Sequence, residues 1–187
     1  MKIVAIVGSN RKNSFNMKLA QYMQRTYEGK LDIEILPITD LPFYNQEIEL
    51  MPSETVQKFI GKVAQADAVL WVTPEYNYSI PGILKNAIDW LSRVDKVMVG
   101  KPSFIMGASM GALGTVRAQE HLRGILFSPG ISSPLLPRNE VYIGAVHEKF
   151  DDAGQLVHEP TVAFLNIIVT NFISWYDQHT GAFVAKS

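Results

Sequence analysis

The chain contains no cysteine among its 187 residues. This absence excludes a disulfide framework, a thiol nucleophile and every metal site that depends on cysteine ligands. Histidine is also scarce, because the four histidines are spread over positions 121–179 without the spacing of a zinc motif. We therefore expect no metal site, and we expect any chemistry to depend on a bound organic cofactor.

An excess of charge of either sign is missing as well. The formal net charge is −1, and the 17 basic and 18 acidic residues are interspersed, which argues against nucleic acid as a partner. No apolar run approaches the roughly 18 residues of a membrane-spanning helix, and the N-terminus enters an apolar run without a charged leader. We expect a cytoplasmic protein that does not associate with membranes.

Short apolar runs alternate with longer amphipathic stretches along the chain. Buried strands are predicted at 3–7, 33–36, 68–72 and 104–106, with a fifth within 131–143. Apolar residues at helical spacing predict helices around 15–22, 56–63, 84–91, 115–127 and 159–176. This rhythm and this length favour one α/β domain over 1–187. We expect a flavodoxin-like three-layer sandwich, with helices on both faces of a five-stranded parallel sheet of order 2-1-3-4-5.

The first polar segment, GSNRKNSFN at 8–16, follows the first predicted strand. In this sheet order, ligands bind at the carboxyl ends of the strands, and the backbone N–H groups that begin the next helix suit an anion. Side-chain donors for a phosphate are available from Ser9, Asn10, Arg11, Ser14 and Asn16. The segment lacks the patterns of a nucleotide P-loop and of a dinucleotide fold. A simpler interpretation is that Asn13 or Ser14 only caps the helix.

The second segment, TPEYNYSIPGILKNAIDW at 73–90, follows the third predicted strand. Pro74 and Pro81 each fix one φ angle, so the backbone between them is expected to hold one shape. Tyr76 or Tyr78 can then line or stack on a flat ring, whose edge meets the exposed N–H groups. The alternative is that Pro81 simply opens a helix and the tyrosines pack on neighbouring loops.

A glycine-rich segment, GASMGALGTVRAQEHLR at 107–123, follows the fourth predicted strand. Glycines allow a bound ring to approach the backbone closely, and the nearest contacts are expected from Ser109, Met110, Gly111 and Gly114. Strands 1, 3 and 4 are neighbours in the predicted order, so the three segments converge at one edge of the sheet. A phosphate site and a rigid aromatic slot describe a mononucleotide with a large flat ring, which FMN fits better than AMP or GMP.

GSNRKNSFN, PEYNYSIPGILKNAIDW and ASMGALGTVRAQEHLR together resemble the three signature segments of the NAD(P)H-dependent FMN reductase family. These flavodoxin-like enzymes include quinone, azo-dye and chromate reductases. The resemblance implies non-covalent FMN, with phosphate contacts on Ser9, Arg11, Ser14, Phe15 and Asn16. It implies isoalloxazine contacts on Pro74, Glu75, Tyr76 and Asn77, with Ser109 and Gly111 closing the other side. The stretch 112–114 departs from the family pattern, which is richer in glycine.

The same resemblance implies an oxidoreductase that passes hydride from NAD(P)H through bound FMN to an acceptor. The acceptor is a quinone, free flavin, azo compound or chromate, and no residue selects among them. No side chain is expected to be catalytic, because the chemistry is assigned to N5 of the flavin, with backbone donors of 75–77 stabilising charge on the ring. The family also implies a homodimer or homotetramer, and Trp90 and Trp175 are candidates for the interface or the core.

Two other functions suit the same sheet. A flavodoxin-type electron carrier would share the FMN site, but such carriers present a strongly acidic docking surface. A net charge of −1, with basic residues such as Lys58 and Arg93 on the predicted helices, does not supply one. A phospho-receiver domain needs carboxylates after the first strand, where this chain has Gly8, Ser9 and Asn10.

Overall fold

One parallel sheet organises the part of the chain that the structure, a computed structural model, describes, residues 1–184. Its order is β2-β1-β3-β4-β5, as predicted, and each neighbouring pair is parallel. The strands are β1 (Lys2–Val7), β2 (Asp32–Leu36), β3 (Ala68–Val72), β4 (Ser103–Ala108) and β5 (Val141–Ile143). The fifth strand is therefore short and occupies the end of its predicted window.

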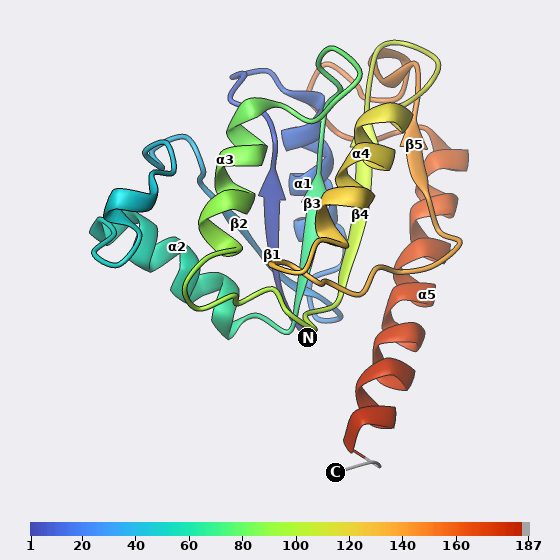
Figure 1. The fold of residues 1–187 in the computed structure, drawn as a ribbon. Helices are drawn as coiled ribbons and strands as arrows, with labels where there is room; N and C mark the ends of the chain where they lie inside the picture. The colour runs from blue at the N-terminus through green and yellow to red at the C-terminus, as the bar shows by residue number, and fades with distance from the viewer. Residues whose placement is uncertain (185–187) are drawn as a thin grey trace.

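Helices cover both faces of the sheet (Figure 1). They are α1 (Phe15–Thr26), α2 (Glu54–Gln65), α3 (Gly82–Leu91), α4 (Val116–Leu126) and α5 (Glu159–Val184), with short 3₁₀ turns η1 (Gln46–Ile48) and η2 (Val146–Glu148). One apolar cluster joins the sheet to α1 and α5, and the other joins it to α2, α3 and α4. This is the predicted three-layer sandwich. No helix within residues 1–184 has the length and apolar character needed to cross a membrane.

The central strand β3 shows why the sequence forms this sheet. All of its residues are buried, because both faces of a parallel sheet are covered by helices. Successive side chains of a strand point to opposite faces, so Leu70 packs in the cluster with α1 and α5 while Trp71 packs with α2, α3 and α4. The residues Leu84, Ala87, Ile88 and Leu91, predicted as core, are each at most 1% exposed.

The strand register brings three loops to one edge of the sheet. Val7 is paired with Val72, and Val72 is paired with Met106, so β1, β3 and β4 end side by side. The next residues extend this alignment, because the Gly8 N–H donates to the Val72 carbonyl at 2.8 Å and the Thr73 N–H donates to the Met106 carbonyl at 3.0 Å. The loops that follow these strands gather at the top of the molecule in Figure 1.

The connection 37–52 is fastened to α3. The Asn86 side chain accepts the Tyr44 N–H at 2.7 Å, and the Trp90 indole N–H donates to the Pro42 carbonyl at 2.9 Å. Trp90 is 2% exposed and belongs to the core, so it offers no surface to a second subunit. Trp175 is partly buried and packs against Phe172, with 5.9 Å between ring centroids.

Candidate functional site

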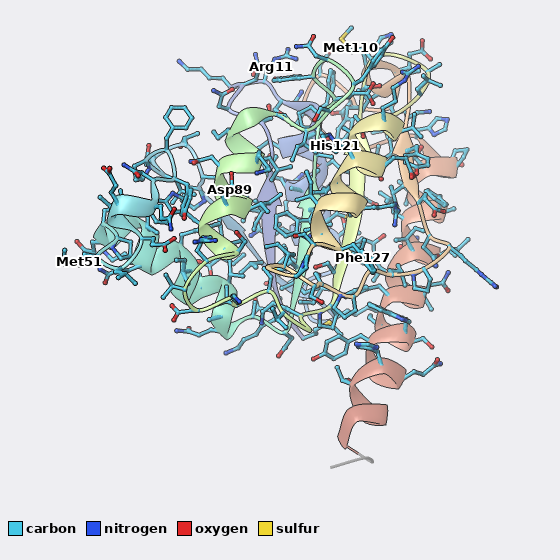
Figure 2. The ribbon with its side chains drawn as sticks, in the orientation of Figure 1. Arg11, Met51, Asp89, Met110, His121 and Phe127 are labelled. Carbon is cyan, nitrogen blue, oxygen red and sulfur yellow. The ribbon has the colours of Figure 1, made fainter. Side chains whose placement is uncertain are left out.

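A cavity of about 210 Å³ opens where β1, β3 and β4 end. It is lined by Ser9, Arg11, Ser14, Phe15, Asn16, Pro74, Glu75, Tyr76, Ala108, Ser109 and Met110. The structure therefore brings most of the predicted site residues together from three loops. Four residues expected at the site do not line the cavity: Asn10, Asn77, Gly111 and Gly114. Figure 2 shows Arg11 and Met110, from two of these loops, at the same end of the molecule.

The start of α1 supplies unpaired backbone donors to this cavity. Ser14 is the N-cap, since its hydroxyl accepts the Met17 N–H at 3.2 Å and its carbonyl accepts the Lys18 N–H at 3.0 Å. Within the described chain, the N–H groups of Phe15 and Asn16 have no partner. These donors lie at the positive end of the helix dipole. The capping role expected of Ser14 and an anion site are therefore compatible.

Arg11 places a positive charge beside these donors. Its side chain is exposed, and its guanidinium makes no ion pair with residues 1–184. The loop is shaped locally by Ser9, which is 7% exposed and whose hydroxyl accepts the Arg11 N–H at 3.4 Å. A planar guanidinium that is free to turn toward the cavity suits the oxygens of a phosphate.

The Asn16 side chain has a different position from the one that the sequence suggests. It is 4% exposed, its amide N–H donates to the Ala108 carbonyl at 2.9 Å, and its carbonyl accepts the Ala108 N–H at 2.9 Å. The amide thus joins the start of α1 to the end of β4 instead of facing a phosphate. Asn16 acts on the cavity by positioning these two walls, and its backbone N–H is the group left for an anion.

The segment after β3 is a tight hairpin. Tyr76 and Ser79 exchange two backbone hydrogen bonds of 3.0 Å, and the two residues between them, Asn77 and Tyr78, have φ angles of 51° and 63°. Two positive φ angles are typical of a type I′ turn. Of the backbone donors expected from 75–77, the Tyr76 N–H is used by the turn.

Glu75 anchors this hairpin to α4. Its carboxylate accepts the backbone N–H groups of Arg117 at 2.9 Å and Ala118 at 3.2 Å, and it lies 3.5 Å from the Arg117 guanidinium. The helix needs this cap because its own N-cap residue, Thr115, has a φ of 69° and makes no side-chain cap. The Glu75 side chain therefore holds two loops of the site together while it lines the cavity.

The two tyrosines of the hairpin have separate environments. Tyr76 lines the cavity and is 42% exposed. Tyr78 lies outside the lining, and the Arg117 guanidinium stacks over its ring, 4.2 Å from the centroid. Next to it, the Ser79 hydroxyl and His121 Nδ1 are 2.7 Å apart. Tyr76 is thus an aromatic residue of the cavity wall, whereas Tyr78 is 70% exposed and contacts Arg117 of α4.

The loop after β4 is held by close backbone packing. A Cβ atom on Gly107 would lie 1.9 Å from Thr115 Oγ1 and 2.5 Å from the Thr73 carbonyl oxygen, so only glycine fits. The Ser109 hydroxyl donates to the Gly111 carbonyl at 3.0 Å, and that carbonyl also accepts the Ala145 N–H at 3.1 Å. Gly111 therefore supports the loop from behind the cavity wall.

A buried glutamine that the sequence did not single out also positions this loop. Gln119 is fully buried on α4, and its amide N–H groups donate to the Val141 carbonyl at 2.8 Å and to Thr115 Oγ1 at 3.1 Å. No sequence pattern marks this role, because its partners are identified only once α4 and β5 lie side by side.

The cavity is suited to binding, and its described residues include no nucleophile paired with a base. Nor do residues 1–184 contain a group of three or more His, Asp or Glu side chains that could hold a metal ion. The lining offers Arg11 and the start of α1, with its free N–H groups, together with the Tyr76 ring and the Met110 thioether. These are the features that a phosphate joined to a flat ring requires. They fit FMN.

Comparisons with known proteins agree with this geometry. Residues 1–148 match the family described as NADPH-dependent FMN reductase. The chain is 40% identical over 181 residues to the NADH:(hydroxy)cinnamate reductase subunit CrdA of Vibrio ruber, covering 96% of this chain and 89% of that protein. It is 39% identical over 183 residues to the NADH-dependent flavin reductase subunit 2 of Lactobacillus johnsonii, covering 95% and 98%.

Two further matches extend the comparison. A quinone reductase of Escherichia coli is 38% identical over 178 residues, covering 92% of this chain and 93% of that protein. The solved structure of FerB, a flavoenzyme NAD(P)H:(acceptor) oxidoreductase from Paracoccus denitrificans, superposes with a TM-score of 0.87 and 36% identity, covering 95% and 98%.

Proposed function

Because the chain belongs to the NADPH-dependent FMN reductase family, we propose that its cavity at the ends of β1, β3 and β4 binds FMN and that its electron acceptor is a quinone or a free flavin. The protein is an NAD(P)H-dependent, FMN-containing oxidoreductase. The observation that carries the site proposal is the convergence of free donors and an aromatic wall on one cavity. Phe15 and Asn16, whose N–H groups are free, line this cavity together with Tyr76.

Each wall of the cavity has a role in this proposal. Arg11, the Ser14 hydroxyl and the free N–H groups of α1 hold the phosphate, since charge-assisted donors bind phosphate oxygens most strongly. Tyr76 and the N–H groups of Glu75 and Asn77 meet the ring, and Ser109 closes the far side. Bound FMN supplies the redox chemistry, taking up hydride from NAD(P)H and delivering electrons to the acceptor. The protein orients both partners and needs no catalytic side chain.

The acceptor proposal is supported by the relatives. Those with 38–40% identity are named for quinones, flavin and (hydroxy)cinnamate as the molecules that they reduce. A quinone is a flat, apolar acceptor that can replace the nicotinamide at one exposed ring face, so alternate occupation of that face predicts ping-pong kinetics. Azo compounds and chromate are proposed as additional acceptors, because a reduced flavin can pass electrons to either.

We also propose that the protein is a homodimer or homotetramer in the cytoplasm. Exposed apolar side chains in the connection 37–52 support self-association, since Phe43 and Met51 are each 85% exposed and Leu50 is 80% exposed. The absence of cysteine is compatible with a reducing compartment. Light scattering at micromolar concentration tests the assembly, and a monomer would contradict it.

The test of function begins with the absorption spectrum of the purified protein. We expect a flavin spectrum that bleaches when NADH or NADPH is added without oxygen and returns when a benzoquinone follows. Steady-state rates at several quinone concentrations should give parallel double-reciprocal lines. A protein that holds FMN but is not reduced by either nicotinamide would be an electron carrier. If the protein bound no flavin, the proposal that its cavity holds FMN would be wrong.

A further inference from the structure

A second cavity, of about 430 Å³, lies between β5, η2 and the first turn of α5. Among its lining residues are Ala112, Tyr142, Lys149 and Phe164. Residues of β5 and of the beginning of α5, which are neighbours on the right of Figure 1, contribute to its lining. None of these residues lines the cavity assigned to FMN.

The loop after β4 contributes residues to both cavities. Met110 lines the first and Ala112 lines the second, so they are two residues apart in the same loop. Backbone hydrogen bonds fasten this loop to the second cavity, since the Ala145 N–H donates to the Gly111 carbonyl at 3.1 Å and the Val146 N–H donates to the Ser109 carbonyl at 3.0 Å. The loop after β4 is therefore held between the two cavities, with residues that line each of them.

The second cavity combines aromatic rings with an unpaired cation. Phe164 is 38% exposed on α5, and Tyr142 is held in place because its hydroxyl donates to Glu120 at 3.1 Å. Lys149 is half-buried, and its ammonium has no ion-pair partner within residues 1–184. An aromatic wall and a free ammonium suit a flat ring that carries an anionic group.

We propose that this second cavity binds the adenylate part of NAD(P)H while the nicotinamide reaches the FMN site. This inference rests on the proposed function. The two rings of the dinucleotide are separated by two riboses and a diphosphate, so one molecule would extend from one side of the loop after β4 to the other. The adenine packs against Phe164 and Tyr142, and Lys149 contacts a phosphate. The site selects the nucleotide and takes no part in hydride transfer.

The experiment uses hydride donors with and without the adenylate. Lys149→Met and Phe164→Leu are compared with the unmodified protein in stopped-flow reduction of bound FMN by NADH, by NADPH and by 1-benzyl-1,4-dihydronicotinamide. We expect the dissociation constants of NADH and NADPH to rise roughly tenfold in each variant. The rate with the truncated donor and the FMN affinity should not change. Adenosine 2′,5′-bisphosphate should compete with NADPH, and more weakly in the variants.

Matched controls separate this site from general effects. Lys30→Met removes an exposed lysine in the turn before β2, and Ile167→Ala removes an exposed side chain one helical turn after Phe164 but outside the cavity. Both should bind the dinucleotides normally. The proposal would be overturned if Lys149→Met and Phe164→Leu left the dissociation constants of NADH and NADPH unchanged. It would also be overturned if both variants impaired reduction by the truncated donor as much as reduction by the dinucleotides.

Two further outcomes have distinct meanings. A change in oligomeric state of Phe164→Leu in light scattering would show that a second copy of the chain covers the cavity, and this would overturn the adenylate proposal. If the unmodified protein is reduced by none of the three donors, the proposed function itself fails. Normal reduction of the unmodified protein with no effect of either variant rejects the second site alone.

Discussion

Glu75, near the start of the loop after β3, caps α4 through the backbone N–H groups of Arg117 and Ala118. The carboxylate accepts the Arg117 N–H at 2.9 Å and the Ala118 N–H at 3.2 Å. Because Thr115 provides no side-chain cap, this contact satisfies the start of α4 from outside its own loop. The contact therefore fixes the β3 loop, which lines the proposed FMN cavity, relative to α4, which follows the loop after β4.

Replacing Glu75 by alanine should lower the free energy of unfolding by about 1–2 kcal/mol, the usual cost of losing an N-cap. Glu75→Gln should lose less, because its amide oxygen still accepts one N–H. Urea denaturation of the flavin-free protein measures both changes. The matched control is Glu28→Ala, which removes an exposed carboxylate in the turn after α1. Similar losses for Glu28→Ala and Glu75→Ala would contradict the capping role.

Replacement of Gly107 and of Gly61 by alanine should have opposite effects on stability. A Cβ on Gly107 would meet Thr115 Oγ1 at 1.9 Å and the Thr73 carbonyl oxygen at 2.5 Å, whereas nothing lies within 4 Å of a Cβ on Gly61 in α2. Gly107→Ala should destabilise the protein by about 1–3 kcal/mol or more, since backbone must move. Gly61→Ala should stabilise it by roughly 0.5–1 kcal/mol through helix propensity. Chemical denaturation of both variants shows whether their changes in the free energy of unfolding have opposite signs.

The fold was predictable where local pattern alone determines structure. The strand at 68–72 has the predicted bounds because a short, continuously apolar run can be buried only between two layers. The helix predicted over 115–127 forms as Val116–Leu126 for a similar reason, its apolar face packing on the sheet. The order of strands also followed, from rules that hold for open parallel sheets.

The location of the site was predictable from the sequence, but its hydrogen bonds were not. The Asn16 amide pairs with Ala108, which is 92 residues away, and no local pattern announces such a partner. The Tyr76 N–H donates within the turn because Asn77 and Tyr78 both adopt positive φ angles. The flanking prolines do not specify this conformation. The assignment of individual residues to FMN stays a prediction that variants can test.

Asn16→Asp tests the bridge between α1 and β4. The aspartate keeps the acceptor for the Ala108 N–H but loses the donor to the Ala108 carbonyl, and it places a charge at a buried position. At neutral pH the free energy of unfolding should fall by about 1–3 kcal/mol. Burial raises the folded-state pKa of the new carboxyl, so the loss should shrink as the pH is lowered and the group becomes protonated.

The control for this variant is Asn13→Asp, an exposed asparagine in the same loop. It should change stability by less than about 0.5 kcal/mol. Urea denaturation at several pH values measures both variants. The protonated carboxyl carries no charge and its O–H can again donate to the Ala108 carbonyl. A loss for Asn16→Asp that does not diminish at low pH would therefore contradict the role of both the buried charge and the lost donor.

Arg11 allows a test of the phosphate end. Arg11→Ala should weaken FMN roughly tenfold or more, because a charge-assisted contact is typically worth about 1.5–3 kcal/mol, and it should leave riboflavin nearly unchanged. The neighbouring Lys12 is exposed but does not line the cavity, so Lys12→Ala serves as the control. Fluorescence titration of the flavin-free protein gives both affinities. If Arg11→Ala weakened the binding of FMN and riboflavin equally, the phosphate would have to bind at another part of the site.

The last prediction concerns whether a tyrosine hydroxyl takes part in the reaction. Tyr76 lines the cavity and Tyr78 does not, so Tyr76→Phe tests the site and Tyr78→Phe is its matched control on the same hairpin. Both variants keep the ring. If Tyr76 only forms a wall, reduction of bound FMN by NADPH and its reoxidation by a quinone should each stay within a few fold of the unmodified protein.

A general acid behaves differently, because its removal typically costs roughly 10²–10⁴-fold in rate. Stopped-flow measurement of the two half-reactions therefore separates the two roles clearly. A loss above about a hundredfold in either half-reaction of Tyr76→Phe, with FMN still bound and Tyr78→Phe unaffected, would make Tyr76 a proton donor. The same loss in both variants would point instead to a hairpin displaced from α4, which the Glu75→Ala variant should then reproduce.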